Sequence, residues 1–232
     1  EWTKTNNLYG DFAVSFDPDI FCDKKKNDVV VFMMYSKFIK SFSDRLMAIA
    51  LLITLAPLFI AIGLILFFTQ KESIFFIQER TGRNMKRFRV FKYQTLVPSY
   101  TSSLSLSNRE FTFAGNFLRK SGLDELPQLI NVLKGEMSFI GPRPMPVEYE
   151  SKYTHEHFKR FDVAPGITGW AQVHGKNNSS WRARFDFDCW YVDHVSLWID
   201  LKIICMTIYQ VVKSIAGYEE NEMPVFTGEN LD

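Results

Sequence analysis

An uncharged apolar segment, LMAIALLITLAPLFIAIGLILFFTQ, extends from Leu46 to Gln70 and constrains this chain more than any other feature. A helix needs about 20 apolar residues to cross a hydrocarbon core of about 30 Å, so the segment is long enough to cross. It lies too far from the first residue, and is too long, for an ordinary signal peptide. The segment therefore predicts insertion into a membrane rather than burial inside a soluble core.

The topology of this segment depends on Pro57, which lies near its middle. A proline removes one backbone donor and clashes with the preceding turn, so we expect a kink or a break there. Basic residues flank both ends, with Lys37, Lys40 and Arg45 before the segment and Lys71 after it. Because positive charge favours the cytoplasmic face, this pattern is compatible with a re-entrant hairpin. A single span remains the alternative.

The charge of the whole chain points to no partner, because 27 basic residues are balanced by 26 acidic ones. We expect no binding to nucleic acid. The local distribution is more informative, since six basic residues and no acid lie between Arg80 and Lys92. Such a surface suits phosphates or anionic lipid headgroups. A solvated, positively charged face is the simpler alternative.

The remaining patterns favour an α/β chain that is mostly helical, with 232 residues forming one main domain. Lys86–Tyr93 alternates loosely, as a strand does, and Val97–Asn108 is a polar, serine-rich loop. Residues 109–122 have helical spacing, with Gly122 as a stop. Ser196–Gly217 predicts an amphipathic helix that either lies on the membrane surface or packs onto the core. Three widely separated cysteines indicate neither a zinc site nor a disulfide framework.

Two adjacent acids, Asp124 and Glu125, precede a proline and a run of leucines in GLDELPQL. The apolar spacing from Leu126 onward predicts a helix that begins near Pro127. Carboxylates at a helix N-terminus are stabilised by the free amide groups and the helix dipole, so a helix start explains the pair on its own. A carboxylate nucleophile that works with a metal is the catalytic alternative.

A short GPRP motif places Arg143 between Pro142 and Pro144. Each proline fixes its own φ and restricts the residue before it, so Arg143 has little backbone freedom. A guanidinium held in this way suits bidentate phosphate binding. The alternative is a rigid surface turn with an incidental arginine.

Together these motifs resemble the bacterial sugar-transferase family of monotopic polyprenyl-phosphate phosphoglycosyl transferases. The resemblance extends from about Phe38 to Gly217, and it includes LRKSGLDELPQLINVLKGEMSFIGPRP, PGITGWAQVHG and YVDHVSLWIDLKI in the family's order. Such enzymes initiate the assembly of O-antigen, capsule, exopolysaccharide or glycoprotein glycans. The implied organisation is an N-terminal extension (1–37), a membrane-inserted helix broken at Pro57 (38–70), a catalytic domain (71–217) and a C-terminal tail (218–232).

The resemblance implies that Asp124 attacks the β-phosphate of a UDP-sugar, releases UMP and holds the phosphosugar as an acyl phosphate. Polyprenyl (undecaprenyl) phosphate then accepts the phosphosugar. Glu125 would be the acidic partner, and Mg²⁺ would bind at Asp124 and Glu125. The positions expected at the substrate phosphates are Lys92, Arg119 and Arg143, with Pro142 and Pro144 beside the last.

The resemblance also implies a location on the cytoplasmic face of the bacterial inner membrane, with membrane lipids as partners and a homodimer as one possible assembly. The sequence departs from the family at two points. Many members have Ser-Pro at the break of the hairpin, where this chain has Ala56-Pro57. The family also often has a basic residue at the position of Gln94, so Lys92 is the more dependable phosphate contact.

Other interpretations remain open from the sequence. A nucleotide-sugar glycosyltransferase would use Asp186–Asp188 as a DxD metal site and release UDP. A catalytically silent membrane adaptor would only bind lipid. His155–His157 has two histidines but no further ligands nearby, so we expect an exposed segment rather than a metal site.

Overall fold

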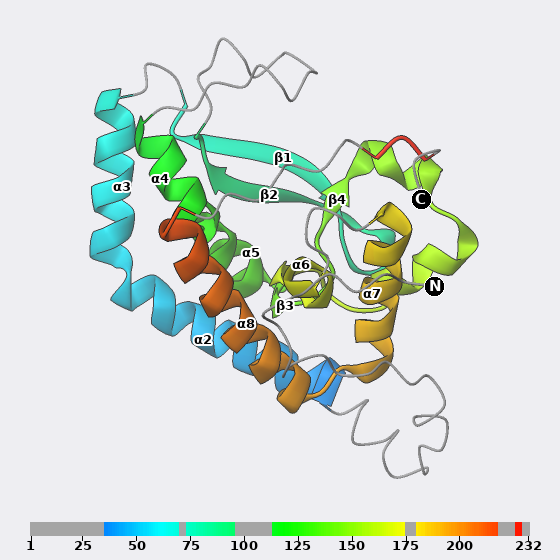
Figure 1. Ribbon diagram of the computed structural model, residues 1–232. Coiled ribbons are helices and arrows are strands. Elements are labelled where there is room, and N and C mark those ends of the chain that lie inside the picture. The colour runs from blue at the N-terminus through cyan, green and yellow to red at the C-terminus, as the bar shows by residue number, and fades with distance from the viewer. Residues whose placement is uncertain (1–34, 70–72, 96–112, 175–179, 218–225, 229–232) are drawn as a thin grey trace, which may run out of the picture.

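Helices dominate the computed structural model, which describes residues 35–69, 73–95, 113–174, 180–217 and 226–228. The predicted α/β, mostly helical class is therefore confirmed (Figure 1). The α-helices are α2 (Lys40–Thr54), α3 (Ala56–Thr69), α4 (Phe113–Ser121), α5 (Leu129–Lys134), α6 (Trp170–His174), α7 (Trp181–His194) and α8 (Leu197–Ile215). The strands are β1 (Phe75–Thr81), β2 (Arg87–Tyr93), β3 (Ser138–Ile140), β4 (Met145–Pro146) and β5 (Gly166–Thr168).

Shorter helical turns connect these elements. A π-helical turn precedes α2, and 3₁₀ helices lie at Arg83–Met85, Leu123–Gln128 (η6), Val147–Lys152 (η7) and His155–Phe161 (η8). The predicted strand at Lys86–Tyr93, the helix stop at Gly122 and the amphipathic helix at Ser196–Gly217 are all confirmed. The predicted loop at Val97–Asn108 lies outside the described residues, as does most of the proposed N-terminal extension.

Helices α2 and α3 form one apolar element that bends by 63° at Leu55 (Figure 1). Pro57 has no N–H to donate to a carbonyl of the preceding turn, so the regular hydrogen-bond pattern cannot continue through this point. The predicted break at Pro57 is thus present. Among the described helices, none alone has the length and apolar composition to cross a membrane, whereas the bent pair together has both.

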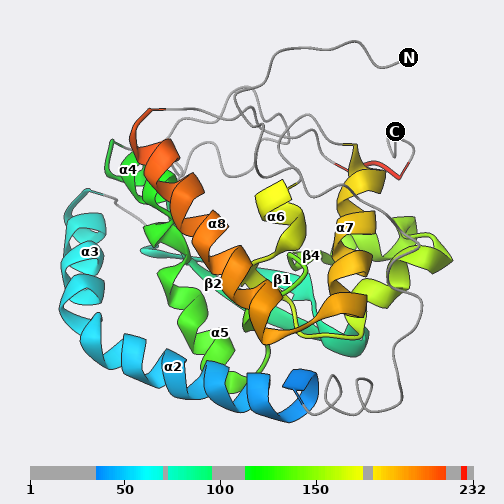
Figure 2. The same cartoon turned by 60° about the horizontal axis from the view of Figure 1, so that its bottom comes forward.

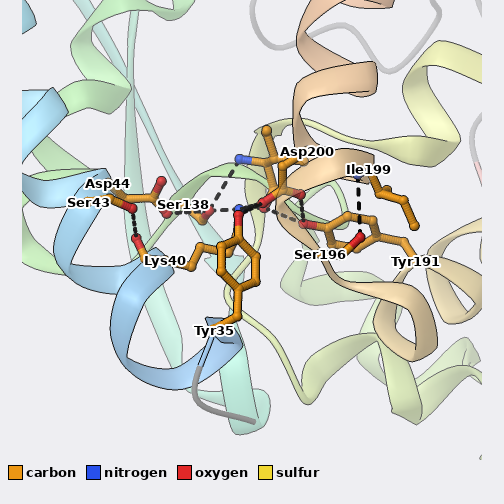
Figure 3. Close-up of polar contacts among 10 residues, drawn as sticks. Tyr35, Lys40, Ser43, Asp44, Ser138, Tyr191, Ser196, Ile199 and Asp200 are labelled. Carbon is orange, nitrogen blue, oxygen red and sulfur yellow. Dashed lines mark hydrogen bonds and ion pairs between the residues drawn. The ribbon is translucent and has the colours of Figure 1, made fainter. Parts of the chain in front are cut away.

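The first turns of α2 are joined to α8 by a buried polar network (Figure 3). Asp200 of α8 accepts hydrogen bonds from Lys40 Nζ at 2.6 Å, Tyr35 Oη at 2.8 Å and Tyr191 Oη at 2.7 Å. Asp200 is only 4% exposed, and a buried carboxylate is tolerated because it is paired and hydrogen-bonded. The network fixes the start of the apolar element relative to the rest of the chain. In Figure 2, α5 packs on α2 while α8 crosses α4.

Two small sheets position the loops of the site. The antiparallel sheet has the order β2-β1-β4, with Phe76 opposite Lys92. The parallel pair β3–β5 aligns Ser138 with Gly166 and Ile140 with Thr168, and the Gly166 amide donates to the Pro142 carbonyl at 3.0 Å. A Cβ atom on Gly166 would lie 2.1 Å from the Gly141 nitrogen, so only glycine allows this close approach. The GPRP motif therefore lies directly against PGITG.

The described part of the C-terminal tail belongs to the core. Phe226 is fully buried among aromatic side chains that include Tyr153, Trp181 and Phe185. Its carbonyl accepts a hydrogen bond from Lys152 Nζ at 3.1 Å. No sequence pattern predicted this contact.

Candidate active site

Asp124 and Glu125 lie in the first turn of the 3₁₀ helix η6, which the chain enters through Gly122 at a φ of 71°. The left-handed conformation favours glycine and ends α4 immediately before the acidic pair. The sequence predicted a helix that begins near Pro127, but α5 begins only at Leu129. Pro127 instead lies inside the 3₁₀ turn, where its missing N–H interrupts no α-helical bond.

The Glu125 carboxylate lies between two cations. Lys92 Nζ donates to Glu125 Oε1, and Arg143 Nη2 donates to the same oxygen at 3.3 Å. The side chains of Lys92 and Glu125 are each 18% exposed, whereas that of Arg143 is 41% exposed and reaches solvent. The acids are thus at the start of a helical turn, as one interpretation predicted, and Glu125 also forms ion pairs with Lys92 and Arg143, two of the residues that the resemblance places at the substrate phosphates.

The two carboxyl groups have opposite pKa shifts. Burial would raise the pKa of Glu125, but Lys92 and Arg143 outweigh it and lower the pKa to about 2. Burial, together with the charge of Glu125, raises the pKa of Asp124 to about 6 against the opposing effect of Lys92, Arg119 and Arg143. At neutral pH, Glu125 is therefore ionised, and Asp124 is mostly ionised, but the protein stabilises the charged form of Asp124 less than that of Glu125. Carboxylates with this difference are typical of catalytic pairs.

The residues predicted to bind phosphate therefore come together from three places in the chain. Lys92 comes from β2, Arg143 from the loop after β3, and Arg119 from the last turn of α4, close enough to lower the pKa of Asp124. Pro142 and Pro144 are both buried on either side of Arg143. Pro57 lies in the bent apolar element and has no part in this cluster.

Arg80 is a further cation at the site that the sequence analysis did not single out. Its Nη1 donates to the Pro144 carbonyl at 3.1 Å, and its Nη2 donates to Gln78 Oε1 at 2.6 Å. Both acceptors are neutral, and burial together with the nearby Arg143 lowers the pKa of Arg80 to about 10. Its place in the basic run from Arg80 to Lys92 was the only signal in the sequence.

The carboxylate oxygens of the acidic pair fit a magnesium ion that is coordinated partly by the protein and partly by a substrate. The described residues contain no cluster of three or more metal-ligating side chains, so the chain offers no complete cage. Mg²⁺ commonly binds through one or two carboxylates together with substrate phosphates and water. Within the described residues, the cation contacts of Glu125 fall on Oε1, so Oε2 and the Asp124 carboxylate are the oxygens that would hold a metal.

The DxD interpretation has no geometric support. Asp186 and Asp188 lie on α7, where Asp186 is exposed and Asp188 is 2% exposed. Asp188 Oδ2 accepts hydrogen bonds from Arg160 Nε at 3.1 Å and Nη2 at 2.7 Å. A carboxylate that is buried against an arginine does not share a metal with an exposed neighbour.

The two histidines of HEH, His155 and His157, have different environments. His157 is 5% exposed, and its Nδ1 lies 3.0 Å from Thr154 Oγ1, whereas His155 is exposed. They form no metal pair, but the expected exposed segment is only partly correct, because His157 is buried.

Comparison with known proteins finds sugar transferases both in the family profile and in the similar sequences. The profile of the family described as "Bacterial sugar transferase" matches residues 35–214. The chain is 40% identical over 185 residues to EpsL, an uncharacterized sugar transferase from Bacillus subtilis (strain 168), and the match covers 78% of this chain and 88% of EpsL.

Two longer proteins are also similar. The UDP-glucose:undecaprenyl-phosphate glucose-1-phosphate transferase of Escherichia coli (strain K12) is 32% identical over 195 residues, which is 79% of this chain and 42% of that protein. The protein of the same name from Xanthomonas campestris pv. campestris is 33% identical over 192 residues, which is 77% of this chain and 40% of that protein. The chain thus spans less than half of these two relatives.

Proposed function

Since the chain belongs to the bacterial sugar transferase family, as an enzyme of the phosphotransferase class, we propose that it transfers a phosphosugar from a UDP-sugar to undecaprenyl phosphate. The products are UMP and an undecaprenyl-diphosphate-linked sugar. The observation that carries this proposal is the position of Asp124 beside a Glu125 carboxylate that Lys92 and Arg143 hold. The names of the longer relatives support the same donor and acceptor classes.

In the first step, an oxygen of Asp124 attacks the β-phosphorus of the donor. A bond forms between this oxygen and phosphorus, the bond to the bridging oxygen breaks, and UMP leaves with the electron pair. The attack of an anion on an anionic diphosphate is repulsive unless cations neutralise the charge. Lys92, Arg119 and Arg143 would supply that positive charge, and Glu125 would keep Lys92 and Arg143 in place.

In the second step, a phosphate oxygen of undecaprenyl phosphate attacks the same phosphorus, and the Asp124 carboxylate leaves unchanged. A covalent intermediate divides one transfer between a water-soluble donor and a lipid acceptor into two simpler displacements. Mg²⁺ held by Asp124 and Glu125 would neutralise charge on the transferred phosphoryl group.

The apolar surface supports placement at a membrane. Large apolar side chains are exposed along α2 and α3, including Phe42, Leu46, Ile53, Ile60, Phe67 and Phe68. Helix α8 packs on the core through Ile203 while it exposes Leu197, Trp198 and Ile208, and Trp198 is 82% exposed. Apolar surface of this extent is typical of a membrane or partner interface. We therefore propose that the bent pair enters the membrane from the cytoplasmic face and leaves it on the same face, as a re-entrant hairpin. Helix α8 would lie at the membrane interface.

The nucleotide product tests the proposal. The purified chain would be incubated in lipid vesicles with undecaprenyl phosphate, Mg²⁺ and a panel of UDP-sugars, and the released nucleotide would be identified by chromatography. We expect one or more donors to release UMP in equal amount to a lipid-linked sugar diphosphate. Release of UDP would instead support the nucleotide-sugar glycosyltransferase, and no release with any donor would support the silent adaptor.

The pH dependence of kcat/KM follows from the pKa of Asp124. The attacking form is the carboxylate, and burial, then Glu125, raises its pKa to about 6. We therefore expect kcat/KM to fall about tenfold per pH unit below pH 6, because this ratio reports ionisations of the free enzyme.

A Glu125→Gln enzyme provides the comparison for this profile. The substitution removes the negative charge that raises the pKa of Asp124, so the acid limb should move to lower pH even though the maximal rate falls. An acid limb at the same pH in both enzymes would show that Asp124 does not govern it.

A further inference from the structure

Three consecutive carbonyl groups of the GPRP loop each have a hydrogen-bond donor. The Pro142 carbonyl accepts from the Gly166 amide at 3.0 Å, the Arg143 carbonyl from Arg160 Nη2 at 2.8 Å, and the Pro144 carbonyl from Arg80 Nη1 at 3.1 Å. Carbonyl oxygens carry partial negative charge, so a free one beside the site would repel a phosphate. These contacts occupy the three carbonyl acceptors of the loop, while the Arg143 side chain extends to Glu125 at the candidate site.

The donor to the Arg143 carbonyl is itself rigidly held. Arg160 comes from η8, and its Nε and Nη2 both donate to Asp188 of α7, while its Nη1 donates to Tyr153 Oη at 3.0 Å. Its guanidinium also lies 5.2 Å from the ring centroid of Phe185. The side chains of Arg160 and Asp188 are 1% and 3% exposed. These contacts hold the Arg160 guanidinium in a single orientation.

A contribution to the stability of the fold does not by itself explain why the Arg160–Asp188 ion pair is buried. Taking two charges out of water costs free energy, and well-packed apolar residues often stabilise a core as well or better. Asp188 Oδ1 is also buried without a hydrogen-bond partner in the part of the chain that the structure describes. An unmatched buried acceptor costs further free energy. Among the hydrogen bonds that Arg160 makes within the described residues, the one to the Arg143 carbonyl connects this buried cluster to the GPRP loop.

We propose that Arg160, oriented by Asp188, is a positioning residue that fixes the backbone of Arg143 and so aims its guanidinium at Glu125 and the donor phosphate. This inference rests on the proposed role of Arg143 in phosphate binding. Catalytic groups displaced by about 1 Å can lose about 100-fold in rate, so a contact outside the site can control the chemistry.

A double-mutant cycle on kcat/KM for UMP release tests the proposal, with Asp188→Asn, Arg143→Ala and the double variant measured in the full chain. The Asp188→Asn substitution keeps the shape of the side chain but removes its charge, so Arg160 loses its fixed orientation. We expect it to lower kcat/KM by about 10- to 100-fold in the wild-type background and by less than about threefold in the Arg143→Ala background. The decrease in Tm caused by Asp188→Asn should be equal in both backgrounds, because Tm depends on the buried ion pair in the core and not on the Arg143 side chain.

A neighbouring ion pair supplies the matched control. Lys159 Nζ and Asp193 Oδ2 join the same two helices at 2.6 Å, but both side chains are close to half exposed, unlike the buried Arg160–Asp188 pair. An Asp193→Asn enzyme should keep the wild-type kcat/KM. A decrease there equal to that of Asp188→Asn would overturn the proposal, because any break between η8 and α7 would then suffice.

A second variant covers the case in which Asp188→Asn does not fold. Arg160→Lys keeps a positive charge for Asp188, but a single ammonium cannot reproduce the fork that joins Asp188 to the Arg143 carbonyl. It should show the same non-additivity with Arg143→Ala. Independent, additive losses in either cycle would overturn positioning while the phosphate role of Arg143 stands. If Arg143→Ala itself leaves kcat/KM unchanged, both the phosphate role and the positioning inference are wrong.

Discussion

An Asp124→Asn enzyme is expected to keep its fold and to lose both turnover and any covalent phosphosugar adduct. The amide has nearly the shape of the carboxylate, but it has no anionic oxygen to attack phosphorus. Loss of a catalytic nucleophile in other covalent enzymes costs on the order of 10⁴–10⁶-fold in kcat. The substitution also removes a carboxyl group whose ionised form burial and Glu125 disfavour, so stability should not fall.

Two measurements separate this result from misfolding. Mass spectrometry of wild-type protein that has been loaded with donor and denatured should show one added phosphosugar, on the peptide that contains Asp124. Asp186→Asn, which changes an exposed acid of α7, is the control and should keep both the adduct and the wild-type rate. An adduct that persists in the Asp124→Asn protein would exclude this residue as the nucleophile.

Replacing Arg143 by alanine should have the next largest effect. A hydrogen bond to a charged group contributes about 1.5–3 kcal/mol, so loss of one such contact corresponds to a decrease in kcat/KM of about 10- to 160-fold. Removal of the guanidinium also takes away one of the cations that lower the pKa of Glu125. We expect steady-state assays of UMP release to show this decrease at saturating undecaprenyl phosphate.

An Arg143→Lys enzyme distinguishes charge from geometry. Lysine keeps the positive charge but lacks the planar fork for bidentate phosphate binding, so its kcat/KM should lie between the wild-type and alanine values. Arg182→Ala, which removes an exposed arginine from α7, should leave the rate unchanged. An Arg143→Ala enzyme with wild-type kcat/KM would contradict the proposed phosphate contact.

The sequence alone determined the features that depend on neighbouring residues. The uncharged segment and Pro57 indicated an apolar element that breaks near its middle, and Gly122 marked the end of α4. The motifs around Asp124 and Arg143 identified the family and the candidate site. The predictions of the break and of the helix end succeeded because backbone restriction by proline and glycine, and helical periodicity, act over a few residues.

Only the tertiary structure decided which distant groups meet. The parallel pairing of β3 and β5 brings PGITG against GPRP, and the packing of η8 on α7 puts Arg160 behind Arg143. The places of Arg80 and Phe226 depend in the same way on long-range contacts. The pKa difference between Asp124 and Glu125 also arises there, because burial and the distance to Lys92 and Arg143 are properties of the folded chain. Local sequence patterns carry no information about such contacts, since side chains far apart in sequence become neighbours only when the core forms.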